Sequence, residues 1–141
     1  KHRLQFVGEH NGVKFYNDSK ATNPVATTTA LSGFENNIIL VCGGKDRGID
    51  FKELVPFFPR IKAMVVVGES KEILFALASA NGVECHRAKK VDDATVFANK
   101  LAKSGDIVLL SPACASWDQY RCFEDRGDEF IATFEKISQE D

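Results

Sequence analysis

Hydrophobic residues fall into short runs that alternate with amphipathic segments along the chain. Short runs rich in Val, Ile and Leu are typical of strands that are buried on both faces of a parallel sheet. This pattern predicts strands at 38–42, 63–67, 83–86 and 106–110. Between them, apolar residues recur at helical spacing. That spacing predicts helices at 24–31, 71–80, 91–103 and about 124–137, and a short helix that begins near Phe51 and stops near Pro56 or Pro59.

The N-terminal segment has the pattern of a β-hairpin. Two strand-like segments, Leu4–Glu9 and Val13–Tyr16, flank Asn11-Gly12, and Asn-Gly in this position favours a tight hairpin turn. After the hairpin, strands and helices alternate, which predicts a mostly parallel sheet covered on both faces. We therefore expect an α/β fold with a Rossmann-like, doubly wound, mostly parallel sheet, to which the N-terminal β-hairpin contributes an antiparallel strand. No linker or repeat divides the chain, so residues 1–141 are expected to form one domain.

The overall charge excludes some classes of partner. The sequence is 44% hydrophobic and 27% charged with a formal net charge of -2, a balance that favours neither nucleic acid nor an anionic membrane as partner. No apolar run approaches the roughly 20 residues that a membrane span needs. The four cysteines form no CxxC pair and have no histidine at metal-ligand spacing, which predicts free thiols and no metal site. Cys42 and Cys85 are expected to be buried in strands.

Three polar loops follow predicted strands, at 18–23, 43–50 and 111–120. Because the carboxyl ends of parallel strands meet at one edge of a sheet, we expect these loops to line a common crevice. Cations, carboxylates and hydroxyls together suit a small anionic ligand held by charge-assisted hydrogen bonds. The loops supply all three kinds of group: Lys20, Lys45 and Arg47; Asp18, Asp46, Asp50 and Asp118; Ser19, Thr22, Ser111 and Ser116.

Each loop also has an ordinary structural explanation. One alternative is that residues 18–23 form a turn and a helix cap and bind no ligand. Another is that Lys45 and Arg47 are loop charges exposed to solvent. Ser116 can cap the next helical turn, and Trp117 is expected to pack against the protein rather than to stack on a ligand. The chain contains no GxxxxGK[ST], GxGxxG or GxSxG motif. If a nucleotide is used, its main phosphate-binding loop is therefore expected outside this chain.

Four motifs together resemble a known family. They are His2-Arg3, the segment Asn17–Asn23, Gly43-Gly44 with the following Arg47–Phe51, and the segment Leu109–Tyr120. These motifs, spread along nearly the whole chain, resemble the C-terminal domain of the Mur ligases, in particular the branch that adds D-glutamate. The chain begins at Lys1 without an initiator methionine or leader, and we expect it to be a fragment of a longer protein.

The resemblance implies an ATP-dependent ligase of bacterial cell-wall synthesis. Such an enzyme joins D-glutamate to UDP-N-acetylmuramoyl-L-alanine through an acyl phosphate. It implies that ATP and Mg²⁺ are bound mainly by a central domain and the UDP-sugar by an N-terminal domain, both absent here. The fragment is then inactive alone, and the ligase is cytoplasmic and monomeric. Two alternatives stay open: a related Mur or folylpolyglutamate-type ligase that adds another amino acid, and a non-catalytic Rossmann-like binding module.

The resemblance also assigns roles to individual residues. Those that match D-glutamate contacts are Thr22, Arg47, Ser116 and Phe123, with Trp117 at a neighbouring backbone contact. Those that match nucleotide contacts are Arg3, Asp18 and Lys20, of which Lys20 is the expected catalytic residue. One position departs from the family, because Arg47 stands where a lysine is usual. Either Arg47 or Lys45 is therefore expected to hold the substrate carboxylate.

Overall fold

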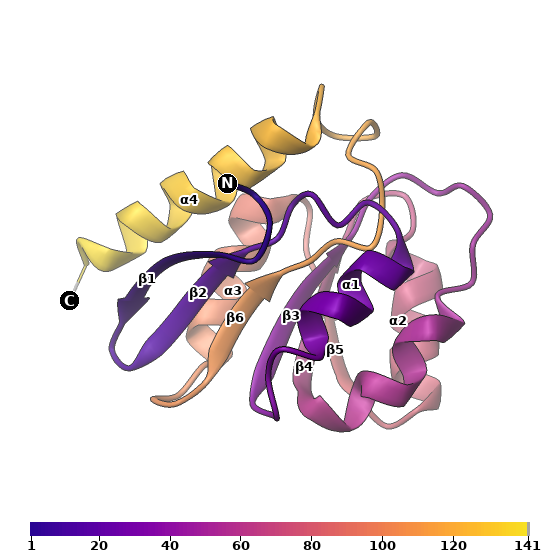
Figure 1. The fold of residues 1–141 in the computed structure, drawn as a ribbon, viewed down its shortest axis with the longest axis horizontal. Coiled ribbons are helices and arrows are strands. Elements are labelled where there is room, and N and C mark those ends of the chain that lie inside the picture. The colour runs from indigo at the N-terminus through magenta and orange to yellow at the C-terminus, as the bar shows by residue number, and fades with distance from the viewer. Residues whose placement is uncertain (141) are drawn as a thin grey trace.

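The computed structural model describes residues 1–140, in which helices cover both faces of a six-stranded sheet (Figure 1). The strands are β1 (Gln5–His10), β2 (Val13–Asn17), β3 (Ile38–Gly43), β4 (Ile61–Val67), β5 (Glu84–Arg87) and β6 (Ile107–Leu110). The helices are α1 (Pro24–Leu31), the 3-10 helix η1 (Lys52–Arg60), α2 (Lys71–Ala80), α3 (Val91–Leu101) and α4 (Phe123–Ser138). The predicted alternation of strands and helices is confirmed.

The N-terminal hairpin forms as predicted. β1 and β2 pair antiparallel, and His10 lies opposite Val13 across the turn. Asn11 and Gly12 have φ angles of 53° and 78°. A two-residue turn with positive φ at both positions matches the right-handed twist of the strands, and Asn and Gly are the residues that adopt this conformation most easily.

The strand order is β1-β2-β6-β3-β4-β5, and every pair except β1–β2 is parallel. This topology confirms the mostly parallel α/β sheet with an antiparallel N-terminal strand. The last strand, β6, inserts between β2 and β3. As a result, the carboxyl ends of β2, β6 and β3 are neighbours at one edge of the sheet, where ligands bind in open α/β folds.

Each face of the sheet has its own hydrophobic core. Successive residues of a strand point to opposite faces, so Leu40 and Cys42 pack towards α1, η1 and α2, whereas Ile39 and Val41 pack towards α3 and α4. Figure 1 shows α1 and α2 in front of the sheet and α3 behind it. The two cores hold the central strands rigidly, which fixes the loops at their carboxyl ends.

Some local expectations need correction. The short helix is a 3-10 helix that continues to Arg60, because Pro56 and Pro59 lack the N–H groups that a regular α-helix requires. The helix expected at 91–103 ends at Leu101. Cys85 is only half-buried, because β5 is an edge strand, although Cys42 is fully buried as expected. None of the helices in the described part of the chain is long and apolar enough to cross a membrane.

Candidate functional site

The site is built from three loops at the carboxyl edge of the sheet. We call them the β2–α1 loop (18–23), the β3–η1 loop (44–51) and the β6–α4 loop (111–122). The Asp18 N–H donates to the Leu110 carbonyl at 2.7 Å, which continues the parallel pairing of β2 and β6 into the loops. The strand order therefore places the three loops side by side.

Main-chain hydrogen bonds join the β3–η1 and β6–α4 loops. The Gly43 N–H, at the end of β3, donates to the Pro112 carbonyl at 2.9 Å, and the Lys45 N–H donates to the Ala115 carbonyl at 2.9 Å. The Gly44 backbone approaches so closely that a Cβ atom there would lie 2.5 Å from the Ala115 oxygen. A residue without a side chain is therefore required at this position.

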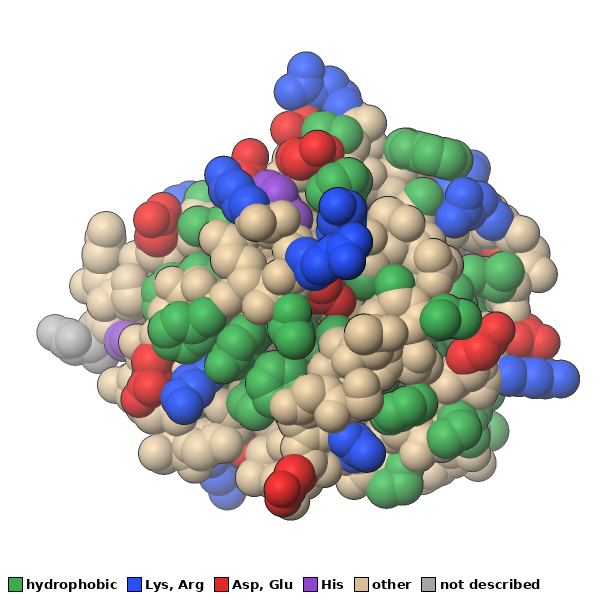
Figure 2. Space-filling view, viewed as in Figure 1, with side chains coloured by type: hydrophobic (Ala, Val, Ile, Leu, Met, Phe, Trp, Pro, Cys, Tyr) green, Lys and Arg blue, Asp and Glu red, His purple; other side chains and the backbone are tan. Residues whose placement is uncertain are grey.

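A pocket of about 470 Å³ opens between the N-terminal segment, the β2–α1 loop and α1. Its lining residues are Arg3, Leu4, Asp18, Lys20, Ala21, Ala26, Thr29 and Ala30. On the face drawn in Figure 2, basic side chains gather near the centre, beside acidic and hydrophobic groups. The pocket brings together the three residues that the family resemblance predicts to contact a nucleotide, and it combines positive charge with apolar walls.

Asp18 is buried at the back of this pocket, with 5% of its surface exposed. One carboxylate oxygen accepts a hydrogen bond from Ser111 Oγ at 2.7 Å, and the other accepts one from the Leu4 N–H at 2.9 Å. Burial raises the pKa of Asp18, while these hydrogen bonds and the nearby Arg3 oppose the shift. Because both oxygens are engaged, Asp18 is held in place and itself fixes the β6–α4 loop against the N-terminal segment.

Arg47 contacts two of the remaining site residues, Thr22 and Trp117. Its Nη2 donates to the Thr22 carbonyl at 3.2 Å, and its guanidinium carbon lies 5.4 Å from the centroid of the Trp117 ring. The expectation that Trp117 packs against the protein is wrong, because 65% of its surface is exposed. Lys45 instead pairs with Glu69 at 3.1 Å. The geometry thus favours Arg47 over Lys45 as the cation available to a ligand.

Ser116 lies in the interior of the β6–α4 loop, with 2% of its surface exposed. Its carbonyl accepts hydrogen bonds from the N–H groups of Gln119 and Tyr120 at 3.1 and 2.8 Å, so the main chain, and not the hydroxyl, closes the turn. Within residues 1–140, Ser116 Oγ makes no hydrogen bond of its own. The hydroxyl therefore keeps its hydrogen-bonding capacity for a ligand.

Phe123 contacts the N-terminal segment and the β2–α1 loop. It is the first residue of α4, its ring packs edge-on against His2 at 6.1 Å, and its carbonyl accepts a hydrogen bond from Ser19 Oγ at 2.7 Å. The structure therefore connects Phe123 to the β2–α1 loop and to the N-terminal segment.

Sequence reasoning missed Arg126, which is almost fully buried at 1% exposure. The signal was present, because Arg126 shares the apolar stripe of α4 with Phe130, Phe134 and Ile137. A charged residue on a buried stripe indicates a specific set of hydrogen-bond partners. No group of three or more His, Cys, Asp or Glu side chains that could hold a metal ion is found in residues 1–140.

Comparison with known proteins places the chain in a family. The family model described as "Mur ligase, glutamate ligase domain" matches residues 2–114. A UDP-N-acetylmuramoylalanine--D-glutamate ligase from Shouchella clausii is 57% identical over 93% of this chain, and one from Streptococcus suis is 56% identical over 97%. The chain spans only 29% and 31% of the length of these two relatives.

Solved structures confirm the fold at much lower sequence identity. A murein peptide ligase from Psychrobacter arcticus matches with a TM-score of 0.66 at 19% identity, over 94% of this chain and 30% of its own. The UDP-N-acetylmuramate-alanine ligase of Thermotoga maritima matches with a TM-score of 0.61 at 16% identity, over 96% of this chain and 30% of its own. The family model covers most of the sequence and the fold agrees, so the chain belongs to the Mur ligase glutamate ligase domain family.

Proposed function

We propose that this chain is the amino-acid-binding domain of an ATP-dependent ligase that adds D-glutamate to UDP-N-acetylmuramoyl-L-alanine in bacterial cell-wall synthesis. High identity to relatives named for D-glutamate ligation supports this proposal over other amino acids. Because the chain spans about 30% of those relatives, we infer that N-terminal UDP-binding and central ATP-binding domains complete the enzyme. The complete ligase would act as a monomer in the cytoplasm.

One observation carries the proposal: the β2–α1 loop (18–23) takes part in both halves of the site. Lys20 lies in the wall of the pocket with Arg3, whereas the Thr22 carbonyl contacts Arg47 on the side of Trp117. A single residue, Ala21, therefore separates the proposed nucleotide-facing group from the proposed amino-acid-facing group. Such proximity suits a reaction in which a phosphorylated carboxylate meets an incoming amine.

The amino-acid side of the site suits a dicarboxylate. Arg47 can bind a carboxylate through two parallel hydrogen bonds, and the Thr22 and Ser116 hydroxyls are further donors. D-Glutamate has two carboxylates to satisfy these donors, which leaves its amino group free to act as the nucleophile. Phe123 and the main chain at Trp117 would complete this side of the site.

The pocket side suits a nucleotide. Arg3 and Lys20 provide positive charge for phosphate groups, and Leu4, Ala26 and Ala30 form apolar walls. ATP would supply the phosphoryl group that activates the carboxylate of the UDP-linked substrate. The role of Lys20 would be to stabilise the negative charge that develops during phosphoryl transfer. Mg²⁺ would be held mainly by the central domain.

An amino-acid panel tests the proposal. The full-length protein is incubated with ATP, Mg²⁺ and UDP-N-acetylmuramoyl-L-alanine, and ADP release is measured with D-glutamate, L-glutamate, L-alanine, L-lysine or diaminopimelate. Release that depends on D-glutamate alone is expected. Dependence on another amino acid would reassign the substrate. If ADP release depended on none of the five amino acids, the chain would be a non-catalytic binding module.

Lys20→Met tests the catalytic role. Loss of one positioned charge typically lowers turnover by about 10²–10³-fold. We expect a fall of that size in kcat of the full-length enzyme, with a much smaller change in the KM for D-glutamate. Lys14→Met, on the exposed face of β2, is the matched control and is expected to leave kcat unchanged. An unchanged kcat in Lys20→Met would remove Lys20 from the catalytic set.

A further inference from the structure

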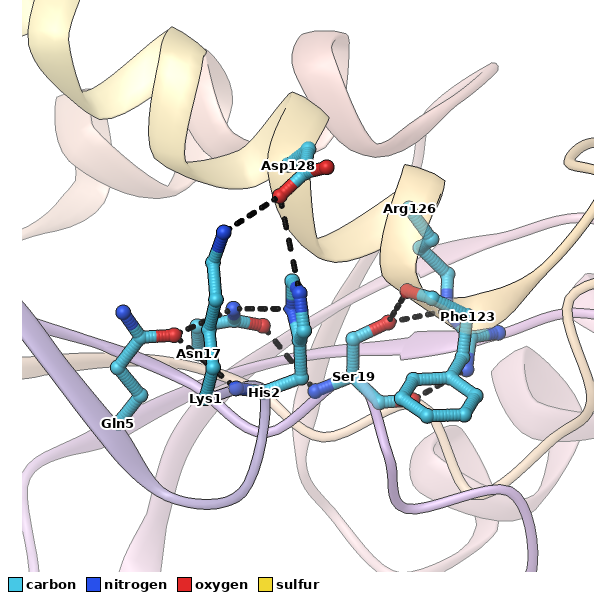
Figure 3. Close-up of polar contacts among 8 residues, drawn as sticks. All are labelled: Lys1, His2, Gln5, Asn17, Ser19, Phe123, Arg126 and Asp128. Atoms are coloured by element: carbon cyan, nitrogen blue, oxygen red, sulfur yellow. Dashed lines mark hydrogen bonds and ion pairs between the residues drawn. The ribbon is translucent and has the colours of Figure 1, made fainter.

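The guanidinium of Arg126 uses its N–H groups to bind two loops of the site at once. Nε donates to Ser19 Oγ at 2.9 Å and Nη2 donates to the Ser19 carbonyl at 2.7 Å. Nη1 donates to the Cys114 carbonyl at 3.0 Å. Figure 3 shows the Arg126 side chain descending from α4 to Ser19. One side chain thus connects the β2–α1 loop to the β6–α4 loop.

Arg126 is a buried cation whose direct partners are all uncharged. Within residues 1–140 no carboxylate lies within ion-pair distance of it, and its hydrogen bonds go to two carbonyls and one hydroxyl. Burial lowers the pKa of Arg126 to about 10, so the guanidinium stays protonated at neutral pH. Burying a charge is costly unless it is fully hydrogen-bonded. An apolar residue at this position, like Phe130 one turn later, would fill the same stripe without the free-energy cost of burying a charge. The presence of an arginine therefore indicates that Arg126 is needed for its hydrogen bonds to the two loops.

The oxygen atoms that accept hydrogen bonds from Arg126 belong to residues close in sequence to the proposed substrate-binding residues. Ser19 immediately precedes Lys20, and Cys114 lies two positions before Ser116. Ser19 Oγ also donates to the Phe123 carbonyl at 2.7 Å, which ties the start of α4 into the same network (Figure 3). The Arg126 guanidinium therefore joins the backbone beside Lys20 to the backbone near Ser116, in addition to the bond between Asp18 and Ser111.

The β3–η1 loop packs onto the same group. A Cβ atom at Gly44 would lie 3.3 Å from Arg126 Nη1 and 2.8 Å from the Cβ of Cys114. Arg126 thus lies where all three loops of the site meet.

We propose that Arg126 is a positioning residue that sets the nucleotide-facing and amino-acid-facing halves of the site at a fixed separation. The proposal rests on the proposed ligase function for its kinetic consequences, but its structural consequence can be measured without it. Arg126 touches neither substrate and acts through Ser19 and Cys114. Its loss would therefore impair both halves together, unlike the loss of a residue that binds one substrate.

The kinetic test uses Arg126→Lys in the full-length ligase. An ammonium keeps the charge but lacks the planar fork, so it cannot reproduce the hydrogen bonds to both loops. Loss of one such bond corresponds to roughly a tenfold effect. We expect the KM values for D-glutamate and for ATP to rise together by about that factor, at a temperature well below the melting temperature of the variant. Arg87→Lys is the matched control, because Arg87 lies on β5 outside the three loops, is exposed and pairs with Glu72, and it should leave both values unchanged.

The structural test uses amide hydrogen exchange of Arg126→Lys and of Ser19→Ala, which keeps Arg126 but removes the bridging hydroxyl. Faster exchange is expected in both 18–23 and 111–122, with β3 and β4 unchanged. Global destabilisation with wild-type KM values would show a purely structural role and overturn the proposal, as would faster exchange in only one loop. If the wild-type ligase did not respond to D-glutamate, the proposed function would fail, and the exchange pattern alone would decide the role of Arg126.

Discussion

At the scale of single residues, the site divides into groups that hold the loops and groups that remain available to a ligand. Asp18 and Arg126 are buried, and both oxygens of Asp18 and each side-chain nitrogen of Arg126 form a hydrogen bond within the protein. Lys20 and Arg47 are exposed at the surface of the same loops. Ser116 combines the two properties, since its carbonyl closes a turn while its hydroxyl is free. This division explains why substitutions at positions as close in sequence as Asp18 and Lys20 are expected to affect the enzyme in different ways.

Ser116→Ala should weaken the use of D-glutamate more than that of ATP. We propose that the hydroxyl binds the amino acid, and a hydrogen bond to a charged group contributes about 1.5–3 kcal/mol. We expect the KM for D-glutamate to rise by about ten- to a hundredfold. Steady-state kinetics of the full-length ligase give both KM values. Ser79→Ala, on the exposed surface of α2, serves as control; equal changes in both KM values for Ser116→Ala would contradict the assignment.

His2 should make the stability of the chain depend on pH. Asn17 Oδ1 accepts from the Ser19 N–H, so Asn17 Nδ2 must donate to His2 Nδ1, at 2.9 Å, which requires a neutral ring (Figure 3). Burial lowers the pKa of His2 below 6.5, against the opposing charge of Asp128. The unfolded chain therefore binds a proton more readily than the folded one, and the free energy of unfolding falls as the pH drops below 6.5.

Denaturant unfolding of the wild type and of His2→Gln between pH 5 and 7 isolates this effect. The difference in stability between the two proteins should decrease towards pH 5, by at most about 1.4 kcal/mol per pH unit. His10→Gln, at the end of β1, is the matched control for the removal of a histidine. A constant difference between wild type and His2→Gln would show that His2 does not titrate in this way. The carboxylates of Asp18 and Asp128 are present in both proteins, so the comparison removes the direct contribution of Asp18.

At the scale of elements, the site depends on how closely the ends of neighbouring strands approach. β3 ends at Gly43 and Gly44 follows it; both have positive φ, and the backbone of Gly44 lies against Ala115 of the β6–α4 loop. The Ser70 N–H donates to the Gly44 carbonyl at 3.0 Å, so the start of α2 is joined to the same point. The strand ends therefore form a continuous main-chain network beneath the functional side chains.

Gly44→Ala should disturb this network. The new Cβ atom would lie 2.5 Å from the Ala115 oxygen, and overpacking typically costs about 1–3 kcal/mol in addition to the strain of positive φ. We expect a loss of unfolding free energy and a raised KM for D-glutamate, because the loops move apart. Gly82→Ala is the control, since Gly82 also has positive φ (74°) but has no atom within 4 Å of an added Cβ. Equal stability losses, with no change in KM, would contradict the importance of this close approach.

At the scale of the whole molecule, much of the fold could be predicted because its signals are local. Apolar runs located the central strands to within about two residues, and Asn11-Gly12 located the hairpin turn. The position of β6 between β2 and β3 could not be predicted, because periodicity does not say which strands pair. The edge position of β5, which leaves Cys85 half-buried, depends on the same unknown.

The candidate site shows a similar limit. The rule that strand ends converge correctly predicted that the loops carrying Lys20, Arg47 and Ser116 lie together. Neither the exposure of Trp117 nor the loop-binding role of Arg126 was predicted, since each depends on partners distant in sequence. The one local sign of the role of Arg126 was the presence of a charged residue on the apolar stripe of α4.

The central claim is that the loop surface around Arg47 binds D-glutamate during ligation. The most direct measurement is ADP release by the full-length ligase as a function of D-glutamate or L-glutamate concentration, for the wild type and for Arg47→Met. The wild type should respond to D-glutamate and not to L-glutamate. Loss of a charge-assisted contact should raise the KM for D-glutamate of Arg47→Met by about ten- to a hundredfold, with the KM for ATP unchanged. Saturation of both proteins at the same D-glutamate concentration, or no response of the wild type to D-glutamate, would contradict the claim.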